Sequence, residues 1–257
     1  MEGILNGKLV FDLNPDTWKG MGMVYEVLRV TEGRPLFLAE HLERMARVAH
    51  GLDVQEASMG VYALIQRAPH CISKNIFLSF APDTKELAVF FIDSFYPPDS
   101  WYAEGIDVNI LEIRRQDPTK KIYDAEYKAA VNSHLQETGV FETLISDSGL
   151  IKEGSRSNVF FVGEEGLITP PVLDVLPGIT RMKVMEAAAE AGIPLTQRPV
   201  SLEEVSGFQG AFLTGTSIDL LPIRKIGEKE LATLSLPLYR QLLQRYREMK
   251  KEDLADA

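Results

Sequence analysis

The sequence contains little cysteine and histidine, and it has no long apolar run. Cys71 is the only cysteine among the 257 residues, which excludes an intrachain disulfide and a thiolate metal cage. The four histidines show no HxH or HxxxH spacing, so we expect no metal site. No apolar run has the length of a membrane helix. The N-terminal MEGILNGKLVFDLNPD lacks the basic and then apolar segments of an export signal. We therefore expect a cytoplasmic protein without a membrane partner.

Positive charge is also scarce. Lys and Arg number 27 against 37 Asp and Glu, which gives a formal net charge of −10. Nucleic-acid affinity depends on neutralising phosphates with basic side chains, so nucleic acid is not expected as a partner. A small anionic ligand remains possible, since it needs only local positive potential. The length fits one large domain or two modest ones.

Strand and helix patterns alternate in the first half of the chain. The segment VYEVLRV alternates apolar and polar residues, which is typical of a half-buried strand. The segment 93–103, rich in proline, serine and aromatic residues, is expected to be a rim loop. The other expected elements are strands at 8–13, 75–80 and 87–93 and helices at 37–52 and 61–68.

A further strand is expected at 108–115, and the polar segment after it makes a plausible domain boundary. In the second half, apolar runs predict strands, and periodic segments predict helices, the first of which ends at Gly139. We expect two α+β domains, 1–115 and 121–257, joined by residues 116–120. The expected elements of the second half are strands at 142–147, 159–162 and 211–214 and helices at 124–138, 182–192 and 236–251.

Three polar turns interrupt this otherwise apolar second half. They are IKEGSRSN (151–158), LPGITR (176–181) and LTGTS (213–217). The second turn begins a helix, whose first N–H groups and dipole can bind an anion. Taken singly, each signal has an ordinary explanation: a helix cap, a strand-end turn, a solvated carboxylate or a surface arginine.

The order and spacing of these motifs make the sequence resemble the fold-type IV pyridoxal-phosphate enzymes, the class IV aminotransferases. That family includes branched-chain and D-amino-acid aminotransferases and aminodeoxychorismate lyase. Glu153 lies 32 residues after Lys121, and LPGITR and LTGTS follow in order. The segments EGSRSNVFFV, TPPVLDVLPGITR, FLTGTS, VYEVLRV and HLERM carry the resemblance, which extends from about Val24 to Ile226.

The resemblance implies pyridoxal 5′-phosphate as cofactor, which needs an amine, an anion site and an acidic partner for its ring nitrogen. It assigns the amine to Lys121, with the adjacent Lys120 as competitor. It assigns the acidic partner to Glu153. Ser157 and Asn158 are expected to contribute to the cofactor cradle. Without the resemblance, a Lys-Lys pair would be a solvated connection.

The resemblance also implies contacts for the rest of the cofactor and for the substrate. Arg114 matches an arginine near the phenolic oxygen of the ring, although Arg115 is adjacent. Arg44 matches a phosphate-binding arginine, although its position alone would favour a helix surface. Tyr25 and Arg29 are expected to face the substrate, with Glu26 left open. The expected phosphate contacts are Arg44, Gly178, Ile179, Thr180, Gly215 and Thr216.

The implied reaction transfers an amino group between an amino acid and a 2-keto acid. The alternative is the aminodeoxychorismate lyase reaction, which releases pyruvate. SHLQET (133–138) resembles the lyase, whereas VYEVLRV resembles the aminotransferases, and we favour the aminotransferase. Phe80 stands near where relatives often carry a carboxylate-binding arginine. The third hypothesis is a non-catalytic homologue that binds the cofactor. The family implies a homodimer.

Overall fold

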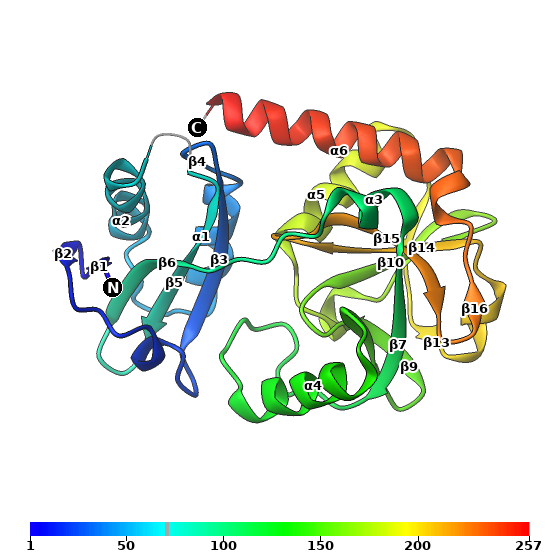
Figure 1. Ribbon diagram of the computed structural model, residues 1–257, viewed down its shortest axis with the longest axis horizontal. Coiled ribbons are helices and arrows are strands. Elements are labelled where there is room, and N and C mark those ends of the chain that lie inside the picture. The colour runs from blue at the N-terminus through cyan, green and yellow to red at the C-terminus, as the bar shows by residue number, and fades with distance from the viewer. Residues whose placement is uncertain (70–71, 257) are drawn as a thin grey trace. The chain divides into compact units, whose positions relative to one another are not determined.

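The computed structural model describes residues 1–69 and 72–256 (Figure 1), so His70 and Cys71 lie outside the described residues. The chain divides into two compact units. The first contains residues 1–95, 120–126 and 250–257, and the second contains residues 96–119 and 127–249. Each unit is built around its own β-sheet. The α+β architecture expected from the sequence is confirmed.

The expected boundary at 116–120 differs from this division because of how the strands pair. Strand β7 (Ile106–Glu112) pairs in parallel with β8 (Glu142–Asp147) and β15 (Asp219–Ile226), so it belongs to the sheet of the second unit. The short segment 120–126 returns to the first unit. There the N–H of Tyr25 donates to the carbonyl oxygen of Lys121 at 3.0 Å, and Val24 forms a β-bridge with Ile122. Strand partners of this kind cannot be read from local periodicity.

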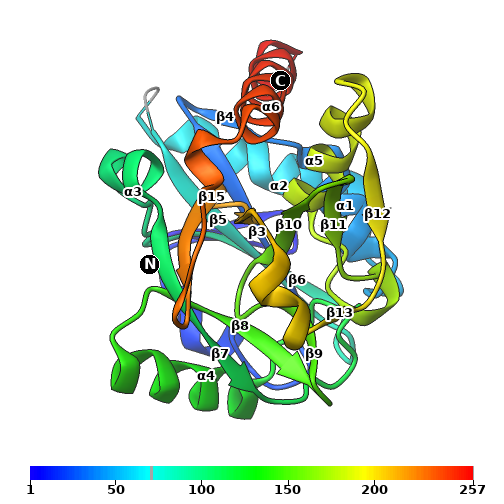
Figure 2. The same ribbon diagram turned by 90° about the vertical axis from the view of Figure 1, so that its right-hand side faces the viewer.

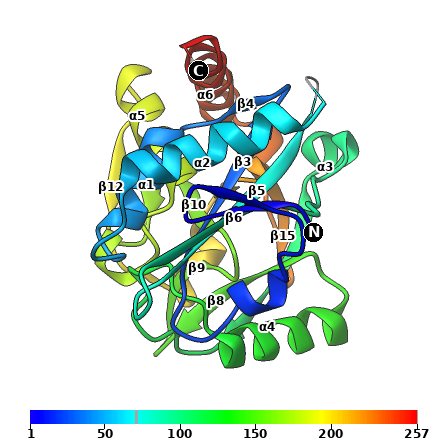
Figure 3. The same cartoon turned by 90° about the vertical axis from the view of Figure 1, so that its left-hand side faces the viewer.

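The first unit contains a six-stranded antiparallel sheet in the order β2-β1-β6-β5-β3-β4. Helices α1 (Leu38–Ala46) and α2 (Val54–Arg67) cover one face of it (Figure 3). A 3-10 helix, Pro15–Trp18, precedes β3. The strands are β1 (Gly3–Leu5), β2 (Lys8–Val10), β3 (Val24–Thr31), β4 (Arg34–Pro35), β5 (Lys74–Ala81) and β6 (Glu86–Ile92).

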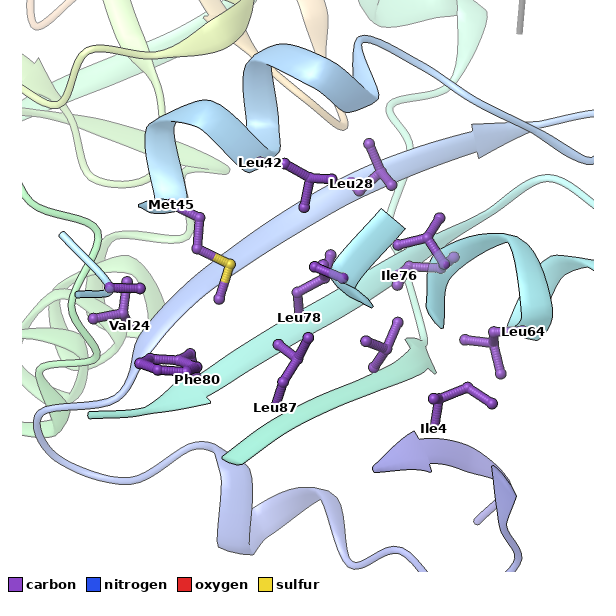
Figure 4. Packing of buried hydrophobic residues seen from close by; sticks show 14 of the residues in the cluster. Ile4, Val24, Leu28, Leu42, Met45, Leu64, Ile76, Leu78, Phe80 and Leu87 are labelled. Atoms are coloured by element: carbon purple, nitrogen blue, oxygen red, sulfur yellow. The ribbon is translucent and has the colours of Figure 1, made fainter. Parts of the chain in front are cut away.

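Alternation along β3 sorts its side chains between the two faces of this sheet. Val24 and Leu28 are buried against Leu42 and Met45 of α1 (Figure 4). Fully burying one such side chain contributes about 1.5–3 kcal/mol. Tyr25 lies on the opposite face. The sequence pattern therefore specifies which residues of β3 form the core and which remain available for another task.

The expected helix over 37–52 is shorter in the structure, and the next helix is longer than expected. Helix α1 ends at Ala46, and Gly51 follows with a positive φ of 94°. Helix α2 begins at Val54 because the Asp53 carboxylate accepts the N–H groups of Gln55 and Glu56 at 2.9 and 3.0 Å. The expected strand at 8–13 is formed only over Lys8–Val10.

The second unit contains a ten-stranded mixed sheet, in the order β12-β11-β10-β14-β15-β7-β8-β9-β13, with β16 paired to β15 (Figure 2). Its helices are α3 (Asp99–Glu104), α4 (Ala125–Thr138, whose first two residues belong to the first unit), α5 (Ile179–Glu190) and α6 (Pro237–Asp256). Three short 3-10 helices occupy Val172–Asp174, Glu203–Gly207 and Thr233–Ser235. Besides β7, the strands are β8 (Glu142–Asp147), β9 (Leu150–Gly154), β10 (Asn158–Gly163), β11 (Gly166–Thr169), β12 (Leu195–Gln197), β13 (Val200–Ser201), β14 (Gly210–Gly215), β15 (Asp219–Ile226) and β16 (Lys229–Glu230).

Three local predictions for this unit need correction. The expected rim loop at 93–103 contains helix α3, which begins directly after Pro98. Strand β15 was not predicted because Pro222 lies inside it. Residues 151–154 belong to strand β9, so the polar turn is confined to Ser155–Ser157. Within residues 1–69 and 72–256, no helix is long and apolar enough to cross a membrane.

The last turns of α6 belong to the first unit, where they hold the start of α1. The Asp253 carboxylate accepts the N–H of Phe37 at 2.7 Å, and Arg34 donates to the carbonyl oxygen of Leu254. Phe37 precedes α1 with a positive φ of 53°, and its own side chain provides no cap. Asp253 therefore satisfies an N–H group that opens the helix.

We predict that Asp253→Ala lowers the free energy of unfolding by about 1 kcal/mol, the usual cost of losing a helix-capping carboxylate. Urea unfolding of the full-length chain measures this change. Lys251→Ala, an exposed substitution in the same turn, is the matched control. Equal effects of the two substitutions would show that the Asp253 contact contributes nothing specific.

Candidate active site

A carboxylate is buried in the core face of the first unit. Glu26 lies on β3 between Val24 and Leu28, on the face that α1 and α2 cover, and it is 0% exposed. An ionised carboxylate in such a place is stable only when it is paired and hydrogen-bonded.

Two residues of α1 provide these partners. Arg44 donates from Nε to Oε1 of Glu26 at 2.8 Å and from Nη2 to Oε2 at 2.6 Å. His41 Nδ1 lies 2.9 Å from Oε2. His41 and Arg44 are three residues apart and so share one helix face. Both are buried, which makes the alternative of a helix-surface arginine wrong for Arg44.

The three side chains shift one another's protonation. Burial works to raise the pKa of Glu26, but the charge of Arg44 and the hydrogen bonds from His41 and Arg44 outweigh it, so the pKa falls from 4.5 to about 2. Burial lowers the pKa of His41 below its ordinary 6.5, and the charges of Arg44 and Lys121 act in the same direction. His41 is therefore neutral, and its Nδ1 carries the hydrogen that Glu26 accepts.

Lys121 belongs to the same neighbourhood. Its main chain pairs with the beginning of β3, and its Nζ lies 4.8 Å from the centre of the Tyr25 ring. That ring stacks on Phe77 at 5.2 Å between ring centres and meets the edge of Tyr123 at 5.9 Å. The amine is thus held over an aromatic face, which attracts a cation.

The face of β3 opposite Glu26 carries Tyr25 and Arg29, as the alternation predicts. The register pairs Tyr25 with Ser79 and Val24 with Phe80. Phe80 is 1% exposed and lies in the core, so it is not the residue of β5 that shares a face with Tyr25. Ser79 shares that face, and its hydroxyl donates to the carbonyl oxygen of Trp18 at 2.7 Å. The substrate-facing role of Tyr25 and Arg29 stays a prediction.

In the second unit, Glu153 is 4% exposed and is held by three donors. Its Oε1 accepts from Nη1 of Arg115 at 2.6 Å. Its Oε2 accepts the N–H of Leu176 at 3.0 Å and the Nδ2 group of Asn158 at 3.2 Å. These donors come from the segment after β7, from β10 and from the turn before α5. They fix the orientation of the carboxylate.

Arg114 and Arg115 point in different directions. The side chain of Arg114 is 83% exposed, and its Nε lies 4.0 Å from a carboxylate oxygen of Asp147. Arg115 carries its guanidinium to Glu153 and also lies over the Tyr127 ring at 5.9 Å. The contact predicted between Arg114 and the cofactor stays a prediction, whereas the arginine that the structure brings to Glu153 is Arg115.

The polar residues of the turn divide between two carboxylates. Asn158 donates to Glu153, whereas Ser155 and Ser157 donate to Glu142. Glu142 begins β8 and is 0% exposed. Ser155 donates to Oε1 of Glu142 from both its hydroxyl and its N–H, and the Ser157 hydroxyl donates to Oε2 at 3.0 Å. The predicted cofactor contact of Ser157 stays a prediction, with its hydroxyl already committed to Glu142.

Helix α5 begins at the motif LPGITR without a side-chain cap. Gly178 occupies the N-cap position, where an added Cβ would lie 2.1 Å from Oδ1 of Asn158. On β14, Thr214 pairs with Asn158, and its buried hydroxyl has no hydrogen-bond partner among the described residues. Uncapped N–H groups, a close-packed glycine and an unsatisfied hydroxyl are what a bound phosphate would require.

Sequence reasoning missed several of these residues. Glu142 gives no signal, because a glutamate at the beginning of a strand resembles a solvated residue. His41 lies inside the quoted motif HLERM but received no role. Arg181 ends LPGITR and holds the fold, since it donates to the carbonyl oxygen of Pro170 and to Oε1 of Gln197. Within the described part of the chain, no group of three or more His, Cys, Asp or Glu is arranged to hold a metal ion.

Comparison with known proteins identifies the family. The family described as "Amino-transferase class IV" matches residues 23–226. D-alanine aminotransferase from Bacillus licheniformis is 23% identical over 254 residues, covering 88% of both chains. A probable branched-chain-amino-acid aminotransferase from Thermotoga maritima is 28% identical over 218 residues, covering 80% of this chain and 78% of its own.

Solved structures show the same fold. A putative branched-chain amino acid aminotransferase from Thermotoga maritima superposes with a TM-score of 0.81 at 25% identity, covering 100% of this chain and 96% of its own. The branched-chain aminotransferase from Thermoproteus uzoniensis gives a TM-score of 0.82 at 24% identity, covering 98% and 95%. The chain therefore belongs to the class IV aminotransferase family. It is a transferase, and its cofactor is pyridoxal 5′-phosphate.

The chemistry of the described residues fits this cofactor. Glu153 is a buried carboxylate held in place by three donors, and Thr214 offers an unsatisfied hydroxyl beside the uncapped start of α5. Lys121 offers a primary amine next to an aromatic ring. The acidic partner, the anion site and the amine that the cofactor needs are each supplied by residues of the appropriate kind.

We predict that stability declines as the pH falls below neutrality. Folding lowers the pKa values of both His41 and Glu26, so each group binds its proton more readily in the unfolded chain than in the folded one. Protonation of His41 therefore reduces stability as the pH falls below about 6.5. Protonation of Glu26 reduces it further as the pH falls from 4.5 to about 2. The Glu26 shift corresponds to about 3 kcal/mol. Denaturant unfolding at pH 7.5 and 5.5 measures the first step. His41→Gln should flatten it, and an unchanged slope would contradict the assignment.

We further predict that Glu142→Gln destabilises the protein by about 1–3 kcal/mol, because an amide would oppose donors that the carboxylate now accepts. Thermal unfolding measures this effect. Glu137→Gln, an exposed substitution at the end of α4, is the matched control. A Glu142→Gln protein as stable as the control would show that the cluster at Ser155 and Ser157 does not depend on the charge.

Proposed function

We propose that the protein transfers amino groups between an amino acid and a 2-keto acid of the branched-chain or D-amino-acid type. The observation that carries this proposal is the family match over residues 23–226, with Lys121 and Glu153 present at the family's spacing. The names of the relatives, D-alanine aminotransferase and probable branched-chain-amino-acid aminotransferase, support these two substrate classes.

Lys121 is the proposed catalytic residue. When bound, pyridoxal phosphate withdraws electrons from the α-carbon of the attached amino acid and so makes its α-proton removable. Lys121 would take up this proton at Nζ as a general base and would then give it up as a general acid. Tyr25 supports this role, since its ring lies beneath Nζ at 4.8 Å.

Glu153 is the proposed partner of the cofactor's ring nitrogen. Its ionised carboxylate keeps a proton on that nitrogen, and the donors Asn158, Leu176 and Arg115 hold the carboxylate in one orientation. Removing one partner of such a buried pair costs on the order of 3–5 kcal/mol.

The phosphate group requires several N–H and O–H donors. We propose that the N–H groups of Ile179 and Thr180 at the start of α5 bind it, together with Gly178, whose missing side chain leaves room for the Asn158 amide beside this turn. Further proposed contacts are made by Arg44, Gly215 and Thr216. Arg114 and Ser157 are retained as proposed contacts to the rest of the cofactor, and Tyr25 and Arg29 as contacts to the substrate.

We also propose that the protein acts as a homodimer in the cytoplasm, with a small amino acid and a keto acid as its partners. The single cysteine of the sequence supports the compartment, because reducing compartments do not require disulfides. Family resemblance supports the dimer.

We predict that the purified protein shows the absorption band of lysine-bound pyridoxal phosphate and that Lys121→Ala abolishes it. Lys120→Ala, which changes the neighbouring lysine, is the matched control and should retain the band. Adding a panel of L- and D-amino acids should shift the wild-type band towards the amine form of the cofactor for the true donor.

Each other outcome has a defined meaning. Pyruvate release from aminodeoxychorismate without any amino acceptor would replace the proposed reaction with the lyase reaction. A coloured protein that responds to no amine would indicate a non-catalytic homologue. Absence of the band after incubation with pyridoxal phosphate would refute the proposed cofactor site.

A further inference from the structure

The buried pair formed by Glu26 and Arg44 is unusual as a stabilising device. Glu26 stands in a β3 row whose neighbours, Val24 and Leu28, are apolar and fully enclosed. Replacing a buried ion pair by apolar residues of similar volume is often neutral or stabilising. The fold itself therefore does not require a carboxylate at this position. We look for the role of the pair in its effect on the orientation of the Arg44 side chain.

The geometry of the pair fixes the plane of the Arg44 guanidinium. Two parallel bonds, at 2.8 Å from Nε and 2.6 Å from Nη2, occupy one edge of the group. Any contact of Arg44 with a phosphate therefore has to come from the side of the guanidinium away from Glu26, where Nη1 and the second N–H of Nη2 point. An arginine held this way has already lost most of its rotamer freedom, so binding an anion costs less entropy.

His41 fixes the carboxylate in turn. Oε2 of Glu26 receives both Nη2 of Arg44 and Nδ1 of His41, whereas Oε1 receives only Nε of Arg44 among these bonds. This arrangement prevents rotation of the carboxylate about its last bond. All three side chains are nine-tenths or more buried, so water does not compete for these hydrogen bonds.

We propose that Glu26 is a positioning residue for cofactor binding: together with His41, it orients the guanidinium of Arg44 towards the phosphate of pyridoxal phosphate. This inference rests on the proposed role of Arg44. Two effects of Glu26 oppose each other, because its negative charge also reduces the attraction between Arg44 and an anion. Without Glu26 the guanidinium loses the two parallel bonds that fix its plane, and we expect this loss of preorganisation to outweigh the gain in charge attraction.

The test compares two ligands that differ only in the phosphate. Full-length protein stripped of cofactor is titrated with pyridoxal 5′-phosphate and, separately, with pyridoxal, and binding is followed by absorption. Glu26→Gln should weaken the binding of pyridoxal phosphate by about 10- to 100-fold. We take this range by analogy from metal sites, where removing a residue that orients a metal ligand has an effect of this size. Pyridoxal affinity should change little. Glu43→Gln, an exposed substitution on α1 between His41 and Arg44, is the matched control.

Arg44→Met and the double variant with Glu26→Gln complete a mutant cycle. If Glu26 acts through Arg44, Glu26→Gln has no further effect on the ratio of the two affinities once Arg44 is replaced. Full additivity of the two substitutions would overturn the inference. So would unchanged or tighter pyridoxal phosphate binding by Glu26→Gln alone.

The cycle separates the failure of this inference from the failure of the proposed function. If Arg44→Met leaves the ratio of affinities unchanged, Arg44 does not bind the phosphate. If only Glu26→Gln leaves it unchanged, the positioning role alone is wrong. Should Glu26→Gln fail to fold, Glu26→Asp keeps the charge but withdraws the carboxylate by one methylene. It should weaken pyridoxal phosphate more than pyridoxal, and equal weakening would overturn the inference.

Discussion

An ionised carboxylate can be buried only where enough donors surround it. Among the described residues, three glutamate side chains are buried, those of Glu26, Glu142 and Glu153, and each is hydrogen-bonded to residues that are distant in the sequence. Glu26 ties β3 to α1, Glu142 organises the turn after β9, and Glu153 joins the end of β7 to the turn before α5. The need of each buried carboxylate for hydrogen-bond donors thus fixes the position of the polar loops that supply them. The apolar cores provide most of the stability, but they do not specify these loops.

The stretch EGSRSN contains many polar side chains because they belong to two separate hydrogen-bonded groups. Glu153 and Asn158 form one hydrogen-bonded group, and Ser155 and Ser157 form another around Glu142. The second group holds the turn between β9, which carries Glu153, and β10, which begins at Asn158. It thereby supports the position of both residues through the backbone.

Local sequence signals predicted the parts of this structure that depend on local chemistry. Alternation placed Val24 and Leu28 in the core and Tyr25 on the other face, and the motif LPGITR predicted the uncapped start of α5. Local sequence signals could not predict which side chains or strands pair with each other. Nothing near Arg114 and Arg115 tells which guanidinium meets Glu153, and Pro222 concealed a central strand. The donors that make the burial of Glu26 and Glu142 possible lie 13 to 18 positions away in the sequence, so this burial can be recognised only in the folded chain.

Contact between Asp253 and Phe37 has a consequence for the synthesis of the chain. The first unit draws on residues 1–95, but its last hydrogen bonds come from the final turns of α6. Phe37 and Asp253 are 216 residues apart, so at about 5–20 residues per second roughly 10 to 40 seconds pass between their synthesis. During that interval α1 begins without its capping carboxylate, and the segment 120–126, which carries Lys121, is synthesised in the first half of it. The nascent first unit therefore lacks these hydrogen bonds until α6 has been synthesised.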